Sequence, residues 1–341
     1  MPDIAVQRFL LRRVMSLPPA ALRAMSGGGV VQRGGRVLDP RMQYLWKTWR
    51  RAGAPAGISP EEARKSWAEL VATVGPEPLR NVTGESITLD GPAGAIPARL
   101  HRPATTAAEA PIVVYLHEGG WIAGGLAESE GVASRLAAAA GAVVLTPAYR
   151  LAPEHRFPAA YEDALAAVRW ARENGHRHGA APGAVSVAGV SNGAGMAAAV
   201  CIELKRTGEP QPHRQVLVCP ILDGAETGRS MHDHADAWPM SVMRLRWLLR
   251  HYLTPDADTN DPRLSPLRTE DLSGLAPAVI AAAGFDPLSD QADLYARRLR
   301  TAGVPASFRL FDTLPHVFPQ FSGVVPEAAE AWRTIGRMLR G

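Results

Sequence analysis

The residues from Gly189 to Gly193 place a serine between two glycines, in the pattern Gly-x-Ser-x-Gly. A valine-rich run, residues 184–190, comes before this pattern, and an alanine-rich helical pattern follows it. Between a strand and a helix, this spacing predicts a turn so sharp that the serine stands exposed at its tip, in a strained backbone conformation. Such a serine could attack a substrate carbonyl. An ordinary glycine-rich turn with a solvent-facing serine is the alternative.

A serine hydroxyl is a poor nucleophile at neutral pH, so it needs a base and an acid that orients the base. In enzymes with this turn, the acid and then the histidine follow the serine along the chain. Of the ten histidines, only His316 lies late, in a loop after the last predicted strand. Asp286 ends the preceding predicted strand. Asp290 is the rival acid, but its place about one turn into the next helix favours a capping role.

Acyl transfer also needs fixed N–H donors for the oxyanion that forms in the transition state. The amide of Asn192, directly after the serine, is one candidate. A second source is His117-Glu118-Gly119-Gly120-Trp121, which follows a buried strand pattern at 112–116. Glycines let backbone N–H groups approach a ligand closely. The alternative for this stretch is an ordinary Gly-Gly turn.

Strand and helix patterns alternate through most of the chain, which predicts an α/β fold with a mostly parallel central sheet flanked by helices. A hairpin opens the pattern and would form an antiparallel edge. The predicted strands are 86–89, 96–102, 112–116, 142–146, 185–190, 215–219, 278–283 and 307–311, and the predicted helices are 128–140, 158–174, 193–206, 288–302 and 326–339. Because ligands bind outside the carboxyl ends of parallel strands, Ser191, Asp286 and His316 are expected to meet there.

Two regions depart from this alternation. Residues 1–75 show helical patterns at 3–25, 40–51 and from Ser59 onward, with a glycine-rich joint at 26–36 and no strand signal. The first of these helices is basic and amphipathic, so it could lie on a membrane surface or fold over its own protein. A helical insert rich in aromatic residues and methionine occupies about 225–255. We expect residues 76–341 to form the catalytic domain, which contains this insert.

Composition narrows the function classes. The chain has 341 residues, is 46% hydrophobic and carries a formal charge of only +4, without a basic run that would favour nucleic acid. Its two cysteines are predicted to be small buried side chains. No apolar run reaches transmembrane length and no secretory signal is recognised, so we expect a cytoplasmic protein with no stable membrane insertion. No cofactor motif appears, and the metal-like run 232–236 lacks the spacing of a metal site.

Five motifs in order resemble the hormone-sensitive-lipase-like (bacterial family IV) carboxylesterases of the α/β-hydrolase fold. They are HEGGW at 117–121, YRLAPEHRFPAA at 149–160, GVSNGA at 189–194, DPLSD at 286–290 and HVF at 316–318. The resemblance implies that Ser191 is the nucleophile, His316 the base and Asp286 the orienting acid. It also implies that the amides of Gly119 and Gly120 join that of Asn192 in the oxyanion hole.

The same resemblance implies that residues 1–75 and the insert form a helical cap over the serine, which favours packing over membrane binding for the first helix. Three residues depart from the family pattern: Glu118 replaces a glycine, Val190 an aspartate and Asn192 an alanine. Glu118 and Val190, with Trp121, are candidate specificity residues. Glu118 is expected to point outward into solvent; otherwise it could favour a cationic substrate.

We therefore predict a serine carboxylesterase that acts on short- to medium-chain, small-molecule esters without a metal or other cofactor. The alternatives are an amidase or lactonase with the same triad, a non-catalytic binder, and a lipase that uses its basic N-terminus at a membrane surface. Relatives in the family are often dimers, so a homodimer is a further expectation from the resemblance.

Overall fold

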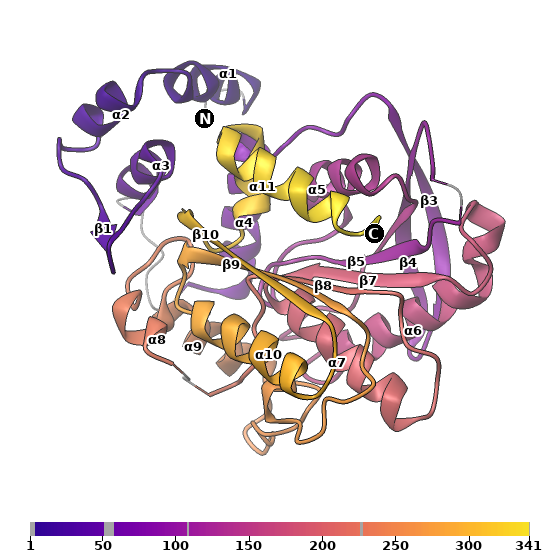
Figure 1. Ribbon diagram of the computed structural model, residues 1–341. Coiled ribbons are helices and arrows are strands. Elements are labelled where there is room, and N and C mark those ends of the chain that lie inside the picture. The colour runs from indigo at the N-terminus through magenta and orange to yellow at the C-terminus, as the bar shows by residue number, and fades with distance from the viewer. Residues whose placement is uncertain (1–3, 51–57, 108, 226–227, 341) are drawn as a thin grey trace.

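A computed structural model describes residues 4–50, 58–107, 109–225 and 228–340 (Figure 1). Eight strands form one sheet in the order β10-β9-β8-β7-β5-β6-β4-β3. The pairs β3–β4 and β4–β6 are antiparallel and the other pairs are parallel. The predicted α/β class with an antiparallel edge is therefore confirmed. The strands are β3 (Val82–Gly91), β4 (Gly94–Pro103), β5 (Ile112–Leu116), β6 (Val144–Pro147), β7 (Val185–Val190), β8 (Gln215–Val218), β9 (Ala278–Phe285) and β10 (Ala306–Pro315).

Helices cover both faces of this sheet, as Figure 1 shows. On one side lie α5 (Leu126–Ala140) and α11 (Pro326–Arg337), and on the other α6 (Ala159–Asn174), α7 (Asn192–Arg206) and α10 (Ser289–Thr301). Side chains of a strand alternate between the two faces. In β5, Leu116 accordingly joins the core under α6 and α7, whereas Tyr115 joins the core under α5 and α11.

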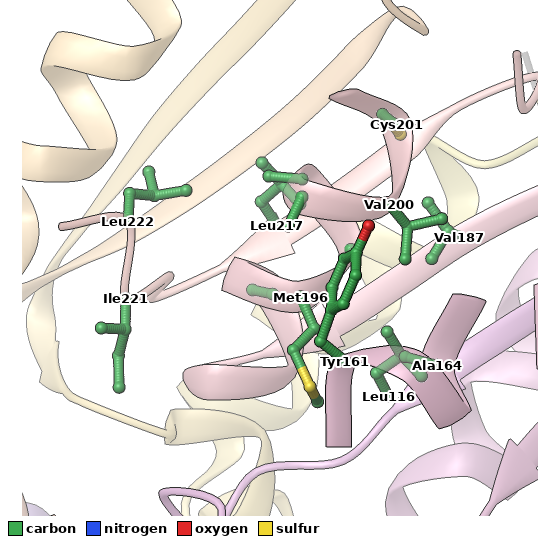
Figure 2. Close-up of a cluster of buried hydrophobic side chains, with 14 of the residues drawn as sticks. Leu116, Tyr161, Ala164, Val187, Met196, Val200, Cys201, Leu217, Ile221 and Leu222 are labelled. Atoms are coloured by element: carbon green, nitrogen blue, oxygen red, sulfur yellow. The ribbon is translucent and has the colours of Figure 1, made fainter. Parts of the chain in front are cut away.

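Buried hydrophobic side chains pack β7, α6 and α7 against one another. Figure 2 shows Tyr161 and Ala164 of α6 beside Val200 of α7 and Val187 of β7. The alanine-rich sequence of α7 lets this helix approach the sheet closely, and its first ten residues are all buried. This packing fixes the position of the turn that joins β7 to α7.

The N-terminal segment is mainly helical, as predicted. Its helices are α1 (Ile4–Met15), α2 (Pro19–Met25), α3 (Pro40–Arg50) and α4 (Pro60–Val74), and the predicted ends at residues 3 and 51 lie outside the described residues. The serine N-cap at Ser59 is confirmed by a capping box, in which Ser59 Oγ accepts from the Glu62 amide and Glu62 Oε2 from the Ser59 amide.

The expectation of no strand in this segment is wrong. A two-residue hairpin forms within the glycine-rich joint, from β1 (Gln32–Arg33) and β2 (Arg36–Val37). Gly34 and Gly35 both have positive φ and close this turn. Two-residue strands carry too little alternation to be recognised in a sequence.

Helix α1 contacts the protein along one side only. Arg8 and Arg12 form ion pairs with Glu77, and Met15 is buried. The apolar side chains of Ile4, Val6, Phe9 and Leu10 are exposed. Among the residues placed by the structure, no helix has the length and apolarity to cross a membrane.

The insert after β8 contains a short helix, α8 (Ser230–Asp233), and a longer one, α9 (Val242–Tyr252). Residues 226 and 227 of the predicted insert lie outside the described part of the chain. Ser241 begins α9 as its N-cap, since its Oγ accepts a hydrogen bond from the Arg244 amide.

Candidate active site

The turn between β7 and α7 has the strained geometry that the sequence predicts. Ser191 has φ 58° and ψ −121°, a conformation that non-glycine residues rarely adopt. A Cβ on Gly189 would lie 2.3 Å from the carbonyl carbon of Gly193, and one on Gly193 would lie 2.0 Å from the Leu116 carbonyl oxygen. Only glycine therefore fits at either position. The expected exposure of Ser191 is wrong, because the residue is only 1% exposed beneath the N-terminal and insert helices.

Ser191, His316 and Asp286 form one continuous hydrogen-bonded chain. His316 Nε2 lies 2.8 Å from Ser191 Oγ, and His316 Nδ1 lies 2.8 Å from Asp286 Oδ2. The other oxygen of Asp286 accepts from the Leu288 amide at 2.9 Å. With the Nδ1 proton held by the carboxylate, Nε2 is free to accept the serine proton.

The rival acid, Asp290, lies elsewhere. Its carboxylate accepts a hydrogen bond from the Ser230 amide, and its own amide donates to Ser230 Oγ. Asp290 thus joins the start of α10 to α8 and does not reach His316.

A third group, Cys219, packs against the acid. The sequence gives no signal for this contact beyond a small buried residue, and both cysteines are indeed buried and free. Burial first, and then the Asp286 carboxylate, raise the pKa of the Cys219 thiol well above its usual range. Ligand atoms of Cys219, Asp286 and His316 lie within 4.8 Å of one another. Because a metal ligand must be a thiolate and the other two groups already bond each other, this donor set suits the triad better than a metal.

The run at 232–236 shows no such convergence. His232 is exposed and contacts its neighbour Asp233. Within the described ranges, no group of three ligand side chains forms there.

The three amides that are candidate oxyanion donors differ in whether they already donate a hydrogen bond within the protein. No hydrogen-bond acceptor contacts the amides of Gly119 and Asn192 within the described chain. The amide of Gly120 instead donates to Asn192 Oδ1 at 2.8 Å. Asn192 Nδ2 donates in turn to the Tyr149 hydroxyl, which donates to the His117 carbonyl oxygen. The side chain of Asn192 therefore holds the loop that carries two of the three amides.

The side chains of Tyr149 and His117 pack against each other and contact the backbone of this loop. Their rings stack with centroids 4.1 Å apart, and His117 Nδ1 lies 2.7 Å from the Glu118 carbonyl oxygen. Burial lowers the pKa of His117 to about 4, so its ring is neutral at pH 7. Tyr149 is the first residue of the YRLAPEH run, which was a signal for its importance although its role was not predicted.

Glu118 does not point into solvent, so that expectation is wrong. The residue is 1% exposed, and its carboxyl group accepts from the Tyr115 hydroxyl at 2.7 Å and from Gln320 Nε2 at 2.5 Å. Burial raises its pKa, against the opposing effect of these hydrogen bonds. Gln320 belongs to η3 (Phe318–Gly323), which directly follows His316 and Val317. Glu118 thus connects the loop at residues 117–121, which we call the oxyanion loop after its candidate donors, to the loop that carries His316.

The other two candidate specificity residues are also buried in the protein core. Trp121 is 2% exposed and stacks on Tyr252 of α9, with ring centroids 4.3 Å apart. Val190 is fully buried at the end of β7. None of Glu118, Trp121 and Val190 lines the cavity above Ser191.

That cavity has a volume of about 330 Å³. We call its lining from the sheet edge the floor: Gly119, Gly120, Ala123, Ser191, His316 and Val317. We call its lining from the helical segments the roof: Trp49, Ile58, Ala63, Ser66, Trp67, Glu69, Leu70, Trp238, Pro239, Met240, Arg244 and Leu248. The roof is mostly apolar, and its two charged side chains, Glu69 and Arg244, were not predicted. Nothing in the sequence pattern indicates which helical residues face the cavity.

Comparisons with known proteins agree with this geometry. A family model described as the alpha/beta hydrolase fold matches residues 113–320. The carboxylic ester hydrolase LipN of Mycobacterium tuberculosis is 39% identical over 312 residues, which cover 89% of this chain and 82% of LipN. An ethyl acetate hydrolase from Pseudomonas putida is 33% identical, over 80% of this chain and 87% of its own length.

A solved structure is similar throughout. The crystal structure of a thermostable esterase from Pseudomonas putida matches with a TM-score of 0.82 and 29% identity, over 88% of this chain and 95% of the esterase. The motifs, the sheet order and these relatives together show that the chain belongs to the α/β-hydrolase family, in its hormone-sensitive-lipase-like group.

Proposed function

We propose that this protein is a serine carboxylesterase that hydrolyses small carboxylic esters through an acyl-enzyme intermediate. The observation that carries the proposal is the continuous chain from Ser191 through His316 to Asp286, with both hydrogen bonds at 2.8 Å. The esterase names of the relatives support the same reaction class.

In this mechanism, Ser191 Oγ attacks the ester carbonyl while His316 Nε2 takes its proton. Asp286 keeps the Nδ1 proton in place and stabilises the imidazolium that forms. His316 then donates its new proton to the leaving alcohol, and later activates the water that releases the acid.

The amides of Gly119 and Asn192 are positioned to stabilise the oxyanion, since neither donates to another acceptor among the described residues. Each such donor contributes roughly 3 kcal/mol to transition-state stabilisation. The amide of Gly120 becomes a third donor only when it leaves Asn192 Oδ1.

The cavity suggests small substrates. Its volume of about 330 Å³ lies at the lower end of ordinary ligand pockets, which favours short and medium acyl chains. We propose that the N-terminal helices and the insert act as a cap, because residues of α3, α4 and α9 form most of the roof. A cytoplasmic location and a homodimer are further parts of the proposal; cell fractionation and sedimentation velocity would test them.

The direct test is a series of p-nitrophenyl esters, from acetate to palmitate, on the purified protein and on Ser191→Ala. We expect activity to peak at short or medium chains and to be lost in the variant. Near-wild-type hydrolysis by Ser191→Ala would contradict the mechanism. If the folded protein hydrolyses none of these esters, amides and lactones are the next substrates to test, because the same triad could cleave them.

A further inference from the structure

Among the residues that the structure places, no acid pairs with Arg244, one of the two charged side chains of the roof. Arg244 and Leu248 lie four residues apart on α9, so they share a face of the helix, and both line the cavity. The Leu248 side chain packs directly against Gly120, where an added Cβ would come within 2.4 Å of it. Arg244 therefore lies about 6 Å along the helix axis from Leu248, one turn nearer the start of α9.

The guanidinium group of Arg244 stacks on an aromatic ring of its own helix. Its central carbon lies 4.8 Å from the ring centroid of Trp247. Stacking of this kind occupies a face of the guanidinium plane and leaves the N–H donors at its edge available. Within the part of the chain that the structure describes, none of these donors bonds to a carboxylate or a carbonyl.

Three other arginines of the N-terminal segment are paired with acids. Arg64 bonds to Glu154, Arg33 to Asp236, and Arg8 to Glu77. Arg244 is half-buried, and burial lowers its pKa with no opposing effect from an acid among the described residues. Glu69, the other charged group of the roof, is exposed to water. An arginine remains protonated in such a place, and a partly desolvated charge is stabilised by a counterion that enters the cavity.

We propose that Arg244 is a binding site for a substrate carboxylate, so that the preferred substrates are esters that also carry a free carboxyl group, such as hemiesters of dicarboxylic acids. This inference rests on the proposed esterase function. The carboxylate would pair with the guanidinium edge while the ester carbonyl lies at Ser191. A single negative charge matches the single cation, whereas a phosphate dianion would leave one charge unpaired in a largely apolar cavity. The roof therefore favours an anionic substrate. The sequence had suggested the opposite, a cationic substrate that would pair with Glu118.

The test compares the mono-p-nitrophenyl ester of glutaric acid with p-nitrophenyl pentanoate, which has the same chain length and no charge. The quantity measured is the ratio of their kcat/KM values in the wild type, Arg244→Gln, Arg244→Lys and Arg250→Gln. Arg250 is an exposed residue of the same helix and supplies the matched control. We expect Arg244→Gln to lower the ratio at least tenfold, mainly through KM, because the contact is made equally in ground and transition states.

Arg244→Lys should recover part of the ratio, and Arg250→Gln should leave it unchanged. A ratio that is the same in Arg244→Gln as in the wild type would overturn the inference while leaving the esterase proposal intact. If the wild type hydrolyses neither ester, calorimetry on the Ser191→Ala protein with monomethyl and dimethyl glutarate still decides. If monomethyl glutarate binds more tightly than dimethyl glutarate, and Arg244→Gln removes the difference, the carboxylate site is supported. Equal or undetectable binding of the two esters rejects it.

Discussion

The floor and the roof of the cavity are held in place by different interactions. On the floor side, Ser191, His316 and their supporting residues Glu118 and Asn192 are at most 1% exposed, and each is hydrogen-bonded to a partner in another segment. The roof consists mainly of aromatic and aliphatic side chains, and its helices α3, α4 and α9 are held to the rest of the protein largely by apolar packing. Buried polar networks fix a geometry, whereas apolar packing tolerates substitution of similar volume.

Backbone strain shows the same contrast. Of the non-glycine residues with positive φ, Ser191, Cys219, Val317 and Trp121 lie in or directly beside the floor. Strain of this kind costs roughly 1–3 kcal/mol per residue and persists only where the surroundings enforce it. We infer that the floor determines the reaction and that the roof selects the substrate, and the following predictions test this division.

Asp286→Asn should have the largest effect. An amide cannot hold the Nδ1 proton of His316, so kcat should fall by about 10⁴-fold with little change in KM. Steady-state kinetics would show it. The control is Asp290→Asn, because Asp290 bonds to Ser230 and not to the histidine. Equal losses in the two variants would contradict the assignment of the acid.

Glu118→Ala should destabilise the protein by roughly 3 kcal/mol, because it leaves the buried Tyr115 hydroxyl without its acceptor and removes one of the two acceptors of Gln320 Nε2. Urea denaturation measures this loss. In the roof, Glu69 is exposed, so Glu69→Ala should change the free energy of unfolding by no more than about 0.5 kcal/mol. Similar costs for both variants would remove the distinction between floor and roof.

Stability should fall between pH 6.5 and pH 4, in part because of His117. Its folded-state pKa is lowered to about 4 by burial, so the unfolded chain binds more protons in this window and unfolding becomes favoured as the pH falls. The expected loss at pH 5 is about 2 kcal/mol for this residue. His117→Gln should flatten the dependence, which denaturation at several pH values would measure. His101 is buried and shifted in the same direction, so some dependence remains, while His232→Gln should change nothing.

Asn192→Ala should raise kcat on small esters by up to about tenfold, because the Gly120 amide is released and the oxyanion gains a third donor. Stability should fall by about 1 kcal/mol, since the hydrogen bonds to Gly120 and Tyr149 are lost. A lower kcat would show instead that the asparagine is needed to hold the loop.

Leu248→Ala should have the smallest effect on the reaction and should move the preferred acyl group by one or two carbons toward longer chains. The leucine side chain lies over Gly120, and a methylene in such a pocket is worth about 1–3 kcal/mol. The ester series measures the shift. Met243→Ala, at an exposed position of α9, is the control. A large loss of kcat for acetate in Leu248→Ala would mean that the roof also shapes the chemistry.

The floor was largely predictable from the sequence because its geometry follows from local rules. A serine between two glycines at the end of a strand specifies the strained turn, and chain order reduces ten histidines to His316. The contacts that support the floor were not predictable. Whether Glu118 faces solvent or a tyrosine depends on η3, which is more than 190 residues away along the chain.

The roof was predictable only as a set of helices. Periodicity predicts a helix at 40–51 and a helical insert at about 225–255, but it does not predict how the helices that form there rotate against the sheet. Arg244 and Arg250 look equivalent in the sequence, yet one lines the cavity and the other is exposed. Substrate selection depends on that rotation, so it could be inferred only from the structure.

The most direct test of the division between floor and roof is pre-steady-state acyl transfer. The protein would be mixed with p-nitrophenyl acetate, quenched within one turnover, and analysed by peptide mass spectrometry. We predict a burst of one p-nitrophenolate per chain and a single acetyl group on Ser191, in the wild type and equally in Leu248→Ala. An acetyl group on another residue, or no burst when ester hydrolysis is fast, would contradict the account.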